Sequence, residues 1–510
     1  METSSLKIYE YPLFIPNSIN INIRLNELEQ KIFSFFLSHN PKKSTFRVAG
    51  GWVRDKLLGN ENDDIDITLD NITGQDYLKL LESEISKNEE SIIKIIKNTN
   101  EKSSNLQTAA INIFGKDIDL VNLRKEVYIK NSRVPEISRG TPEEDAFRRD
   151  ITINCLFYNI NKECVEDFTK KGLYDLKNGL INTPKDSLIS FNEDPLRILR
   201  IIRFATRFRF KISENILKNL MITQEFKNIL SIQRIEKEFS KMLENDFYYA
   251  SIYLLYKNKY LEYILNVEEY SKENNLIDNY FLLNSAMNSI LIKSFIDKKN
   301  LFNNQKQKQN DYKQKLKIEN FATLLLPYKK FEIKEKNKSI SLSKEIGSKK
   351  FMLPKSEIND INILIEGENE LLNKINNKDE NVFTRINMGL YLMKYKFNNI
   401  ISIVKLAICE EYLNNLNNKE KIIEELDSDK IKIIIDKYMK IIEFIKNEKL
   451  EKIENIKPLL DGKQIKQKFN IKNGKDIKKY IDNLIKEQIN NPNITQEECI
   501  NYLNLIKNQI

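Results

Sequence analysis

Residues 46–70 read FRVAGGWVRDKLLGNENDDIDITLD, and this stretch decides the fold of the first part of the chain. A short apolar run ends at Gly50 and Gly51, a helix-like segment begins at Trp52, and a second apolar run covers Ile65–Leu69. Glycine pairs interrupt regular structure because glycine reaches backbone angles that other residues avoid. The pattern therefore predicts a strand, a tight turn, a helix and a second strand, in that order.

Asp64 and Asp66 stand at the start of the second strand. Side chains at i and i+2 of a strand share one face, so both carboxylates face one side while the isoleucines face the core. Two hard oxygen ligands this close suit Mg²⁺, which prefers carboxylates together with substrate phosphates. A polar strand edge would give the same pattern, so the pair indicates a metal site only in combination with other features.

The glycine turn supplies that combination. Gly50 and Gly51 allow backbone N–H groups to approach a phosphate closely, and Arg54 lies one helical turn further on, where it can reach the same anion. Together with Asp64 and Asp66 these residues describe a nucleotidyl-transfer centre. The glycines hold a triphosphate, and the carboxylates hold two metals that activate a hydroxyl and stabilise the leaving pyrophosphate.

A third carboxylate is expected from residues 107–124, QTAAINIFGKDIDLVNLR, which alternate apolar and polar residues and predict a hairpin with a turn at 115–116. Asp119 is flanked there by Ile118 and Leu120 and is a candidate for the third ligand. Asp117 shares its face by the same i, i+2 rule, so both residues stay open. Residues 143–157 are expected to form a helix, and residues 164–183 to contain a glycine turn.

After about residue 185 apolar residues recur every three or four positions, which indicates helices without further strands. The expected fold class is therefore α+β, a small mixed or antiparallel sheet followed by an all-α remainder. The scarcity of turn formers, 13 Gly and 11 Pro in 510 residues, also favours long helices. The polar stretch 302–317 is expected to be a solvated loop between helices.

Composition excludes several classes of function. The only histidine is His39, so mechanisms that need a catalytic histidine or a histidine-rich metal centre are discounted. The four cysteines show no CxxC spacing, which fits a reducing compartment. No apolar run is long enough to span a membrane, and the start METSSLKIYEYPLF lacks the features of a signal peptide or an Arg-rich presequence. A cytoplasmic protein is expected, with the nucleus and the mitochondrion as alternatives; the net charge of +9 suits a polyanionic partner.

The motif GGWVRDKLLG followed by DDIDI resembles the catalytic signature of polymerase-β-like nucleotidyltransferases and, more narrowly, of class II tRNA nucleotidyltransferases of eukaryotic type, the CCA-adding enzymes. The resemblance is dense over residues 45–245, faint between 250 and 450, and recognisable again at 457–505. Further matching segments are IDLVNLRKEVY, GTPEEDAFRRDITINCLFYNI, EDFTKKGLYDLKNGLINTP, EDPLRILRIIRFATRF, IQRIEKEFSKML and IKPLLDGKQIKQKFNIKNGKDIKKYIDNLIKEQINNP.

The resemblance implies that Asp194 and Arg197 select CTP or ATP by their base edges without a nucleic-acid template. Asp194 fits a helix N-cap and Pro195 a first helical position. At 100° per residue one stripe of the helix carries four arginines, which offer donors to the base and to the phosphates. These arginines are Arg197, Arg200, Arg203 and Arg207.

By the same resemblance Arg148 and Arg149 contact the triphosphate, and Asp150 engages the ribose hydroxyls. An internal salt-bridge cluster is the alternative for either arginine. The glycine-containing segment with Gly172, Asp175 and Gly179 resembles the family's hinge between head and helical domains.

The helix with Arg234, Glu238 and Lys241 at i, i+4 and i+7 is expected to carry a structural ladder of charges within itself, without direct catalysis.

The expected domains are a nucleotidyltransferase head at 20–183, a helical neck at 184–265, a helical body at 266–410 and a tRNA-binding helical tail at 411–510. In the tail, two turns open helices whose free N–H groups can bind tRNA phosphates without reading sequence. The tail residues named for this contact are Gly462, Lys463, Gly474 and Lys475.

The leading hypothesis is therefore template-independent addition of CCA to the 3′ end of tRNA from CTP and ATP, with Mg²⁺. A partial adder of CC or A alone, or a poly(A) polymerase, carries the same selecting motif; an intact stretch at 125–142 argues mildly for full addition. A non-catalytic RNA-binding homologue would have lost an aspartate, whereas Asp64 and Asp66 both stand. The oligomeric state cannot be inferred.

Overall fold

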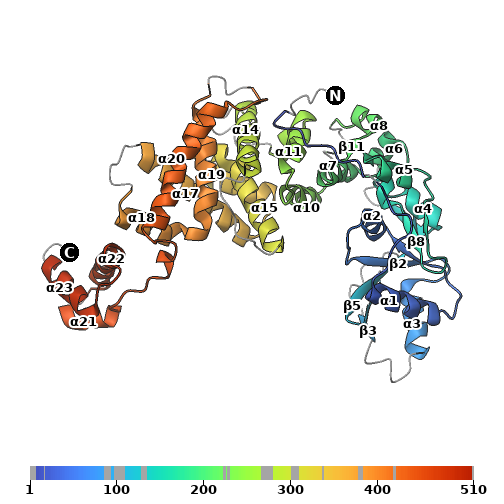
Figure 1. Cartoon of the computed structure of the whole chain (residues 1–510), viewed down its shortest axis with the longest axis horizontal. Coiled ribbons are helices and arrows are strands. Elements are labelled where there is room, and N and C mark those ends of the chain that lie inside the picture. Colours follow the sequence, from blue (N-terminus) through green and yellow to red (C-terminus); the bar gives the residue numbers. More distant parts are fainter. Residues whose placement is uncertain are drawn as a thin grey trace. The chain divides into compact units, whose positions relative to one another are not determined.

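The computed structural model divides into two compact units (Figure 1). The first unit is Glu10–Tyr263, and the second comprises Ile264–Ile510 with the N-terminal residues. This division lies next to the boundary predicted between neck and body, while the boundaries predicted after residues 183 and 410 stay predictions. The description excludes residues 1–6, 17, 85–92, 97–108, 128–134, 222–225, 227–229, 266–278, 300–308, 336–337, 377–382, 417–420, 472 and 508–510.

The first unit contains a seven-stranded sheet in the order β3-β4-β5-β2-β1-β8-β9. Neighbouring strands pair antiparallel except β2 and β5, which run parallel. The α+β prediction, a mixed sheet followed by helices, is confirmed. The strands are β1 (Phe46–Ala49), β2 (Ile65–Leu69), β3 (Ile93–Ile96), β4 (Ala109–Ile113), β5 (Lys116–Asn122), β8 (Phe157–Asn159) and β9 (Cys164–Glu166).

Three helices pack on this sheet: α1 (Glu27–Ser38), α2 (Gly51–Leu57) and α3 (Gly74–Glu84). A capping box formed by Asn26 and Glu29 starts α1. The buried Glu29 carboxylate also accepts a hydrogen bond from Trp52 Nε1 at 3.1 Å and pairs with Lys56 Nζ at 3.0 Å. These contacts tie α1 to α2 and so fix the helix that follows the glycine turn.

The predicted helix over residues 143–157 is wrong beyond its first part. Helix α4 (Pro142–Phe147) ends at Phe147. It is followed by a 3₁₀ turn, η1 (Thr152–Asn154), and then by β8. Tyr158 on β8 pairs opposite Val48 on β1. The β-branched residues around Thr152 and the sheet pairing of β8 outweigh the helical pattern read from the sequence.

The stretch at 125–142 is organised at both ends by strands, β6 (Arg124–Val127) and β7 (Glu136–Arg139), which pair antiparallel. The residues between them, 128–134, lie outside the described part of the chain. The hairpin predicted within residues 107–124 is confirmed as β4 and β5, but its turn lies at Phe114 and Gly115, one residue before the predicted 115–116, and Lys116 already belongs to β5.

The remainder of the first unit is mainly helical, with α7 at its centre. Leu199 and Ile202 of α7 are fully buried, as the periodicity predicted. The Thr206 hydroxyl contacts the Ser251 hydroxyl at 2.6 Å and so joins α7 to α11. The helices are α5 (Gly172–Lys177), α6 (Ser187–Glu193), α7 (Leu196–Phe208), α8 (Glu214–Lys218), α10 (Ile232–Leu243), α11 (Tyr248–Lys257) and α12 (Tyr260–Ile264).

The expectation that no strand follows residue 185 is wrong. A short parallel pair joins β10 (Leu180–Ile181) to β11 (Lys211–Ile212), and β12 (Glu332–Glu335) pairs antiparallel with β13 (Lys338–Ser341). In the second pair Ile333 lies opposite Ile340 on one face. Lysine, glutamate and serine fill most other positions of these strands, so the apolar alternation that marks a strand is nearly absent.

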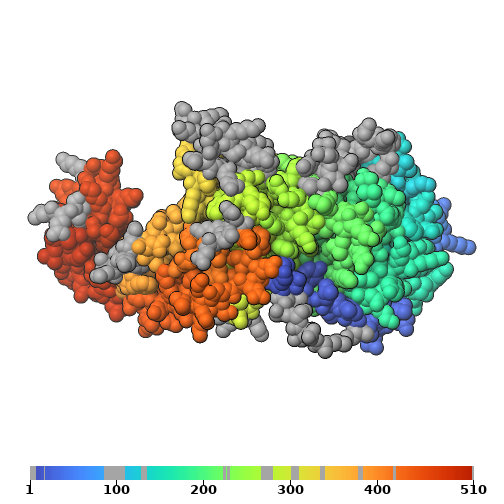
Figure 2. All heavy atoms as spheres, turned by 90° about the horizontal axis from the view of Figure 1, so that it is seen from above, coloured from blue at the N-terminus to red at the C-terminus, as the bar shows by residue number. Residues whose placement is uncertain are grey.

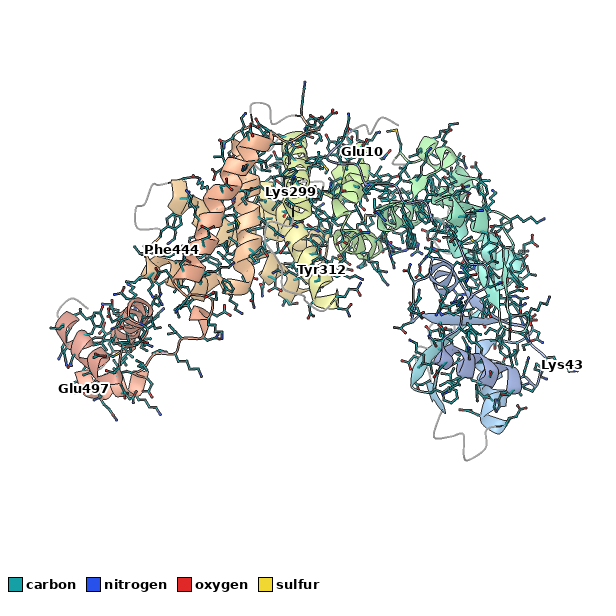
Figure 3. The ribbon with its side chains drawn as sticks, in the orientation of Figure 1. Glu10, Lys43, Lys299, Tyr312, Phe444 and Glu497 are labelled. Carbon is teal, nitrogen blue, oxygen red and sulfur yellow. The ribbon has the colours of Figure 1, made fainter. Side chains whose placement is uncertain are left out.

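The second unit is otherwise helical. The polar stretch expected to be a loop at 302–317 is helical from Gln309 onward, in α15 (Gln309–Leu325), which carries Tyr312 (Figure 3). Residues 302–308 lie outside the description. Lys317 and Leu316 are buried, so this polar helix packs into the unit through its C-terminal half. The other helices before the tail are α14 (Asn279–Lys298), α16 (Leu342–Glu345), α17 (Lys355–Asn376), α18 (Arg385–Tyr395), α19 (Phe397–Asn414) and α20 (Ser428–Asn447).

The last three helices, α21 (Gly462–Phe469), α22 (Gly474–Asn490) and α23 (Gln496–Ile506), share an apolar core of their own (red in Figure 2). Leu460, Ile465, Leu484 and Leu503 are fully buried in it. This core covers only the last part of the tail predicted at 411–510, since α20 also lies within that range, and the predicted start of the tail stays a prediction. Among the described helices none is long and apolar enough to cross a membrane.

Candidate active site

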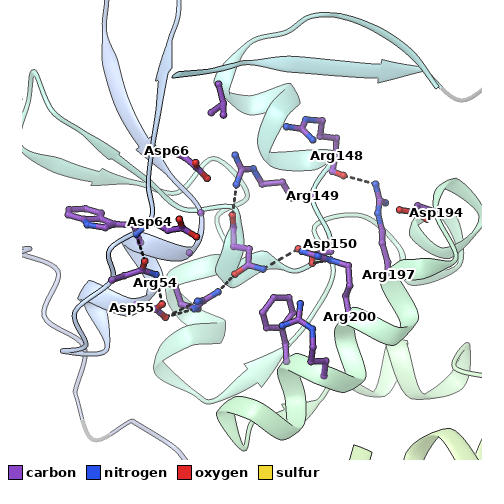
Figure 4. A pocket seen from close by; sticks show the side chains of 18 of the residues that line it. Arg54, Asp55, Asp64, Asp66, Arg148, Arg149, Asp150, Asp194, Arg197 and Arg200 are labelled. Atoms are coloured by element: carbon purple, nitrogen blue, oxygen red, sulfur yellow. Dashed lines mark hydrogen bonds and ion pairs between the residues drawn. The ribbon is translucent and has the colours of Figure 1, made fainter. Parts of the chain in front are cut away.

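A charged cavity of about 950 Å³ lies entirely within the first unit (Figure 4). Its wall is shared by the glycine turn, the start of β2, the segment after α4, and helices α7 and α10. Of the residues that the sequence singled out for catalysis and nucleotide binding, all but the two candidates for the third carboxylate, Asp117 and Asp119, line it. They are Gly50, Gly51, Arg54, Asp64, Asp66, Arg148, Arg149, Asp150, Asp194, Arg197, Arg200 and Arg203.

The glycine turn has the backbone that glycine requires. Gly50 has φ +76°, and a Cβ there would lie 2.8 Å from Arg149 Nη1. The N–H of Gly50 donates to Leu156 O at 3.0 Å and is therefore occupied. Gly51 is the first residue of α2, whose first-turn N–H groups have no helical acceptor. Of the N–H groups predicted to bind an anion, that of Gly50 is therefore excluded. Those at the start of α2 remain candidates.

Arg54 is held tightly within the wall. Its guanidinium pairs with Asp55 at 2.8 Å, donates to the Asn154 side chain, and faces the Phe208 ring at 4.5 Å. Burial lowers the pKa of this guanidinium, against the opposing effect of the Asp55 charge. Arg54 therefore joins the glycine turn to α7, and its predicted contact with phosphate stays a prediction.

Asp66 is a carboxylate whose protonation the cavity favours. Burial first, and then the neighbouring Asp119 and Asp64 charges, raise its pKa to about 6. Within the described residues no hydrogen bond satisfies the carboxylate oxygens of Asp64 or Asp66. A half-buried Asp66 carboxylate beside an exposed Asp64 carboxylate, both without donors among the described residues, fits a divalent cation, which would supply the missing positive charge.

Asp119 lies beside Asp66 because the parallel pairing of β2 and β5 places the two residues opposite each other. Asp117 instead accepts a hydrogen bond from Asn112 Nδ2 at 2.6 Å. This geometry favours Asp119 as the third carboxylate. Among the described residues, however, no group of three His, Cys, Asp or Glu side chains is close enough together to hold a metal ion, so a metal at Asp64 and Asp66 would need further ligands from substrate.

Arg148 and Arg149 both belong to the salt-bridge cluster that the sequence left as an alternative. Asp145 receives Arg148 Nη2 at 2.6 Å and Arg149 Nη2 at 2.8 Å. Arg149 Nη1 also donates to Asn154 O at 3.1 Å. A guanidinium has five N–H donors, so Arg149 keeps donors for an anion while the cluster fixes its orientation toward Asp66 (Figure 4).

Asp150 is buried and paired with Arg200, whose Nε donates to Oδ2 at 2.7 Å. Burial raises the pKa of Asp150, but the Arg200 charge and hydrogen bonds from Asn154 and the Ile151 N–H outweigh it and hold the pKa below its usual range. The carboxylate is therefore ionised and acceptor-only. Asn154 was not predicted as a site residue, although it lies in the family-like segment at 140–160.

The arginine stripe on α7 exists as predicted, and three of its four members, Arg197, Arg200 and Arg203, already have carboxylate partners. Arg197 pairs with Glu193 at 2.8 Å and donates to Arg148 O at 2.5 Å. Arg203 Nε donates to Glu238 Oε2 at 2.6 Å, and its guanidinium stacks on Phe204 at 4.0 Å. The arginines are thus positioned before any ligand arrives.

Asp194 caps α7 as predicted: its Oδ1 accepts from the Leu196 N–H at 3.2 Å, while Pro195 has helical angles.

The charge ladder predicted within α10 is absent. Glu238 points to α7 and meets Arg203 at 2.6 Å and Arg200 at 3.4 Å, while Arg234 pairs with Asp194 at 2.8 Å. Lys241 lines the cavity, and burial followed by the Arg203 charge lowers its pKa. Helical spacing placed these side chains on one face correctly, but that face packs on α7 instead of facing solvent. All three belong to the site.

The glycine-containing segment that resembles the family's hinge packs on the head. A Cβ at Gly172 would lie 2.8 Å from Thr152 O, and Asp175 accepts from the Thr152 hydroxyl at 2.7 Å, so the segment packs closely on η1. Domain rotation there stays a prediction.

At the start of α21 the Asp461 carboxylate already accepts from the Lys463 N–H at 2.8 Å. At α22 Asn473 accepts from the Lys475 N–H at 3.0 Å. The N–H groups expected to be free are therefore partly used, and Lys463 and Lys475 offer exposed ammonium groups instead.

The head that contains the glycine turn and the carboxylate pair is that of a nucleotidyltransferase, since residues 46–182 match the family model described as the poly A polymerase head domain. A mitochondrial CCA tRNA nucleotidyltransferase of Saccharomyces cerevisiae is 32% identical over 503 residues, covering 92% of this chain and 89% of the relative. The tRNA nucleotidyltransferase cca2 of Schizosaccharomyces pombe is 30% identical over 95% of this chain and 99% of its own length. The chain belongs to the family of CCA tRNA nucleotidyltransferases.

The fold agrees with that assignment. The Thermotoga maritima CCA-adding enzyme complexed with tRNA has a TM-score of 0.58 and 19% identity, over 96% of this chain and 99% of that one. At this identity the likeness concerns the fold alone, and it extends over both units.

Proposed function

We propose that this chain adds CCA to the 3′ end of tRNA from CTP and ATP without a template, releasing pyrophosphate. The observation that carries the proposal is that Asp64 and Asp66 line the same cavity as the charged helix α7, in a chain that matches CCA tRNA nucleotidyltransferases over nearly its whole length. A tRNA 3′-hydroxyl and a nucleoside triphosphate can therefore meet at the carboxylates.

Asp64 and Asp66 would hold Mg²⁺, with Asp119 as a third carboxylate beside Asp66. Bound Mg²⁺ would promote loss of the proton from the 3′-hydroxyl and offset charge on the α-phosphate and on the leaving pyrophosphate. The chain itself supplies orientation: the first-turn N–H groups of α2 face the phosphates, and Arg149, fixed by Asp145, directs its remaining donors into the cavity.

Nucleotide selection is assigned to the other end of the cavity. Asp194 accepts hydrogen bonds from a base, Arg197 lies on the next turn of the same helix, and Asp150 accepts from the ribose hydroxyls. A site built to bind those hydroxyls rejects a deoxynucleotide because its buried polar groups would be left unpaired. Arg200 holds Asp150 through its ion pair, and the backbone carbonyl of Arg148 accepts a hydrogen bond from Arg197. Arg203 supports the same helix face through its ion pair with Glu238.

In the tail, Lys463 and Lys475 beside Gly462 and Gly474 are proposed to contact tRNA phosphates. The names of two relatives place them in mitochondria. For this chain we therefore propose the mitochondrion as well as the cytoplasm. Head, neck, body and tail at 20–183, 184–265, 266–410 and 411–510 remain the proposed division of labour.

The test uses purified protein with Mg²⁺ and three tRNA transcripts that end at the discriminator base, at C and at CC. CTP and ATP are supplied singly and together, and products are resolved at single-nucleotide resolution. Addition of C, C and A to the first transcript supports the proposal. Stopping at CC, or extending only the CC transcript, would indicate a partial adder. Long A tails would indicate a poly(A) polymerase. No extension, equal to that of Asp64→Ala, would leave only an RNA-binding homologue.

A further inference from the structure

Asp194 is fixed on every side except the one that faces the cavity. Its N–H donates to Ser190 O at 3.2 Å, and its carbonyl accepts from the Arg197 N–H at 3.0 Å. Its side chain is bound by the Leu196 N–H at Oδ1 and by Arg234 Nη2 at Oδ2, at 3.2 and 2.8 Å. Backbone and carboxylate are therefore both positioned, the backbone by the junction of α6 and α7 and the carboxylate partly by α10.

The arginine in this arrangement comes from a different helix than the aspartate. Arg234 lies on the first turn of α10, lines the cavity and is about half exposed. Its guanidinium has reached across to α7 instead of pairing along its own helix with Glu238, which is engaged by Arg203. The link between Arg234 and Asp194 is thus a contact between helices at the mouth of the nucleotide site.

This contact determines what Asp194 can accept. An ionised carboxylate offers about four lone-pair positions, and the two observed bonds use one on each oxygen. The remaining positions are acceptors only. Cytosine and adenine carry an amino group where uracil and guanine carry a carbonyl oxygen. An oriented, acceptor-only carboxylate therefore favours C and A and opposes the other two bases.

We propose that Arg234 is a positioning residue for base selection: it holds the Asp194 carboxylate in the orientation that favours the amino bases. This inference rests on the proposed function and deepens it, since Arg234 acts through Asp194 and touches no reacting atom. Without Arg234 the carboxylate keeps only its bond to the Leu196 N–H, can rotate about its side-chain torsions, and loses part of its discrimination.

The test measures kcat/KM for CTP and for UTP on a tRNA ending at the discriminator base, and for ATP and GTP on one ending at CC. In Arg234→Gln we expect the CTP-to-UTP and ATP-to-GTP ratios to fall by about tenfold or more, the scale of one charge-assisted hydrogen bond. The KM for tRNA should stay unchanged. Arg234→Lys keeps the charge without the planar fork and should restore part of the ratio.

Two comparisons separate a positioning role from a general loss of structure. Lys237→Gln removes a positive charge from the same helix at an exposed position that does not line the cavity, and it should leave both ratios intact. Asp194→Asn combined with Arg234→Gln should be no worse than Asp194→Asn alone, because residues that act as a unit are not additive. Folding of each variant is followed by the fluorescence of Trp52, the only tryptophan of the chain.

The proposal is overturned if Arg234→Gln keeps the wild-type ratios, if it changes only the KM for tRNA, or if the two substitutions are additive. Should Arg234→Gln be too slow to measure, the same ratios in Arg234→Lys decide. A wild-type protein that extends no tRNA would defeat the proposed function instead, so the two failures are distinguishable.

Discussion

Replacing Asp66 with asparagine should make the metal-free protein more stable while removing its activity. The carboxylate is partly buried, lies beside Asp119 and Asp64, and receives no hydrogen bond from a described residue. Its ionised form is therefore unfavourable in the folded state. The amide of asparagine has nearly the same shape and no charge, so the substitution removes the repulsion without opening a cavity.

The magnitude follows from the pKa of Asp66, which rises from the ordinary 3.8 to about 6 on folding. A difference of this size corresponds to about 3 kcal/mol at neutral pH. Water reaches part of the carboxylate and weakens the effect, so we expect Asp66→Asn to raise the free energy of unfolding by about 1–3 kcal/mol at pH 7.5.

The sign is set by proton binding: between pH 4 and 6 the folded state holds the proton and the unfolded chain does not. Wild-type stability relative to the variant therefore falls as pH rises through this range.

Urea unfolding in EDTA, followed by Trp52 fluorescence, measures the effect where it arises, because Trp52 is buried at the start of α2 in the same unit. Glu82→Gln is the control. Glu82 is exposed on α3, so this substitution removes one negative charge away from the cavity. Added Mg²⁺ should stabilise the wild type and not Asp66→Asn. Equal or lower stability of Asp66→Asn at pH 7.5 in EDTA would refute the reasoning.

Four further outcomes test other parts of the site. Gly50→Ala should lower the free energy of unfolding by about 1–3 kcal/mol and reduce activity, because φ +76° is strained for alanine and its Cβ would meet Arg149; urea unfolding by Trp52 fluorescence checks this, and an unchanged midpoint would contradict it. Glu238→Gln should lower the free energy of unfolding by about 2–4 kcal/mol, since it leaves Arg203 without its buried counter-charge while Arg200 keeps its ion pair with Asp150; wild-type stability would show that the pair of Arg203 and Glu238 is dispensable. Removal of divalent cations should abolish nucleotide addition but leave tRNA binding intact in a gel-shift assay. Below pH 6 the Mg²⁺ concentration for half-maximal activity should rise up to about tenfold per pH unit as protons compete for Asp66, whereas a flat requirement would mean that Asp66 does not bind the metal.

The sequence was sufficient where local rules decide the structure. The Gly50 turn, the shared face of Asp64 and Asp66 and the cap of α7 by Asp194 depend on neighbours in the chain, and each was predicted. The choice between Asp119 and Asp117 needed the pairing of β2 with β5, which no local pattern contains.

Predictions failed where tertiary contacts override local patterns. Glu238 has helical spacing to Arg234, yet its carboxylate is drawn to two arginines of another helix. Asn154 and Asp145 organise Arg54 and Arg149; both lie in the family-like segment at 140–160, but their contacts with these arginines follow only from the fold. The hairpin around Ile333 was missed because its charged residues hide the alternation. The sequence did hold one sign of the arginine packing. Phe204 and Phe208 lie four residues apart on α7, their rings stack in parallel, and Arg203 and Arg54 pack on them.

The turn between β4 and β5 has a consequence for how this chain can change. Phe114 and Gly115 both have positive φ, of 52° and 80°, as a two-residue hairpin turn requires. That turn sets the register of β5, and the register sets Asp119 beside Asp66. One inserted residue at the turn would shift Asp119 to the opposite face of the sheet. We therefore expect the turn between β4 and β5 to tolerate no insertion or deletion. It binds no ligand itself, but the spacing of the carboxylates depends on it.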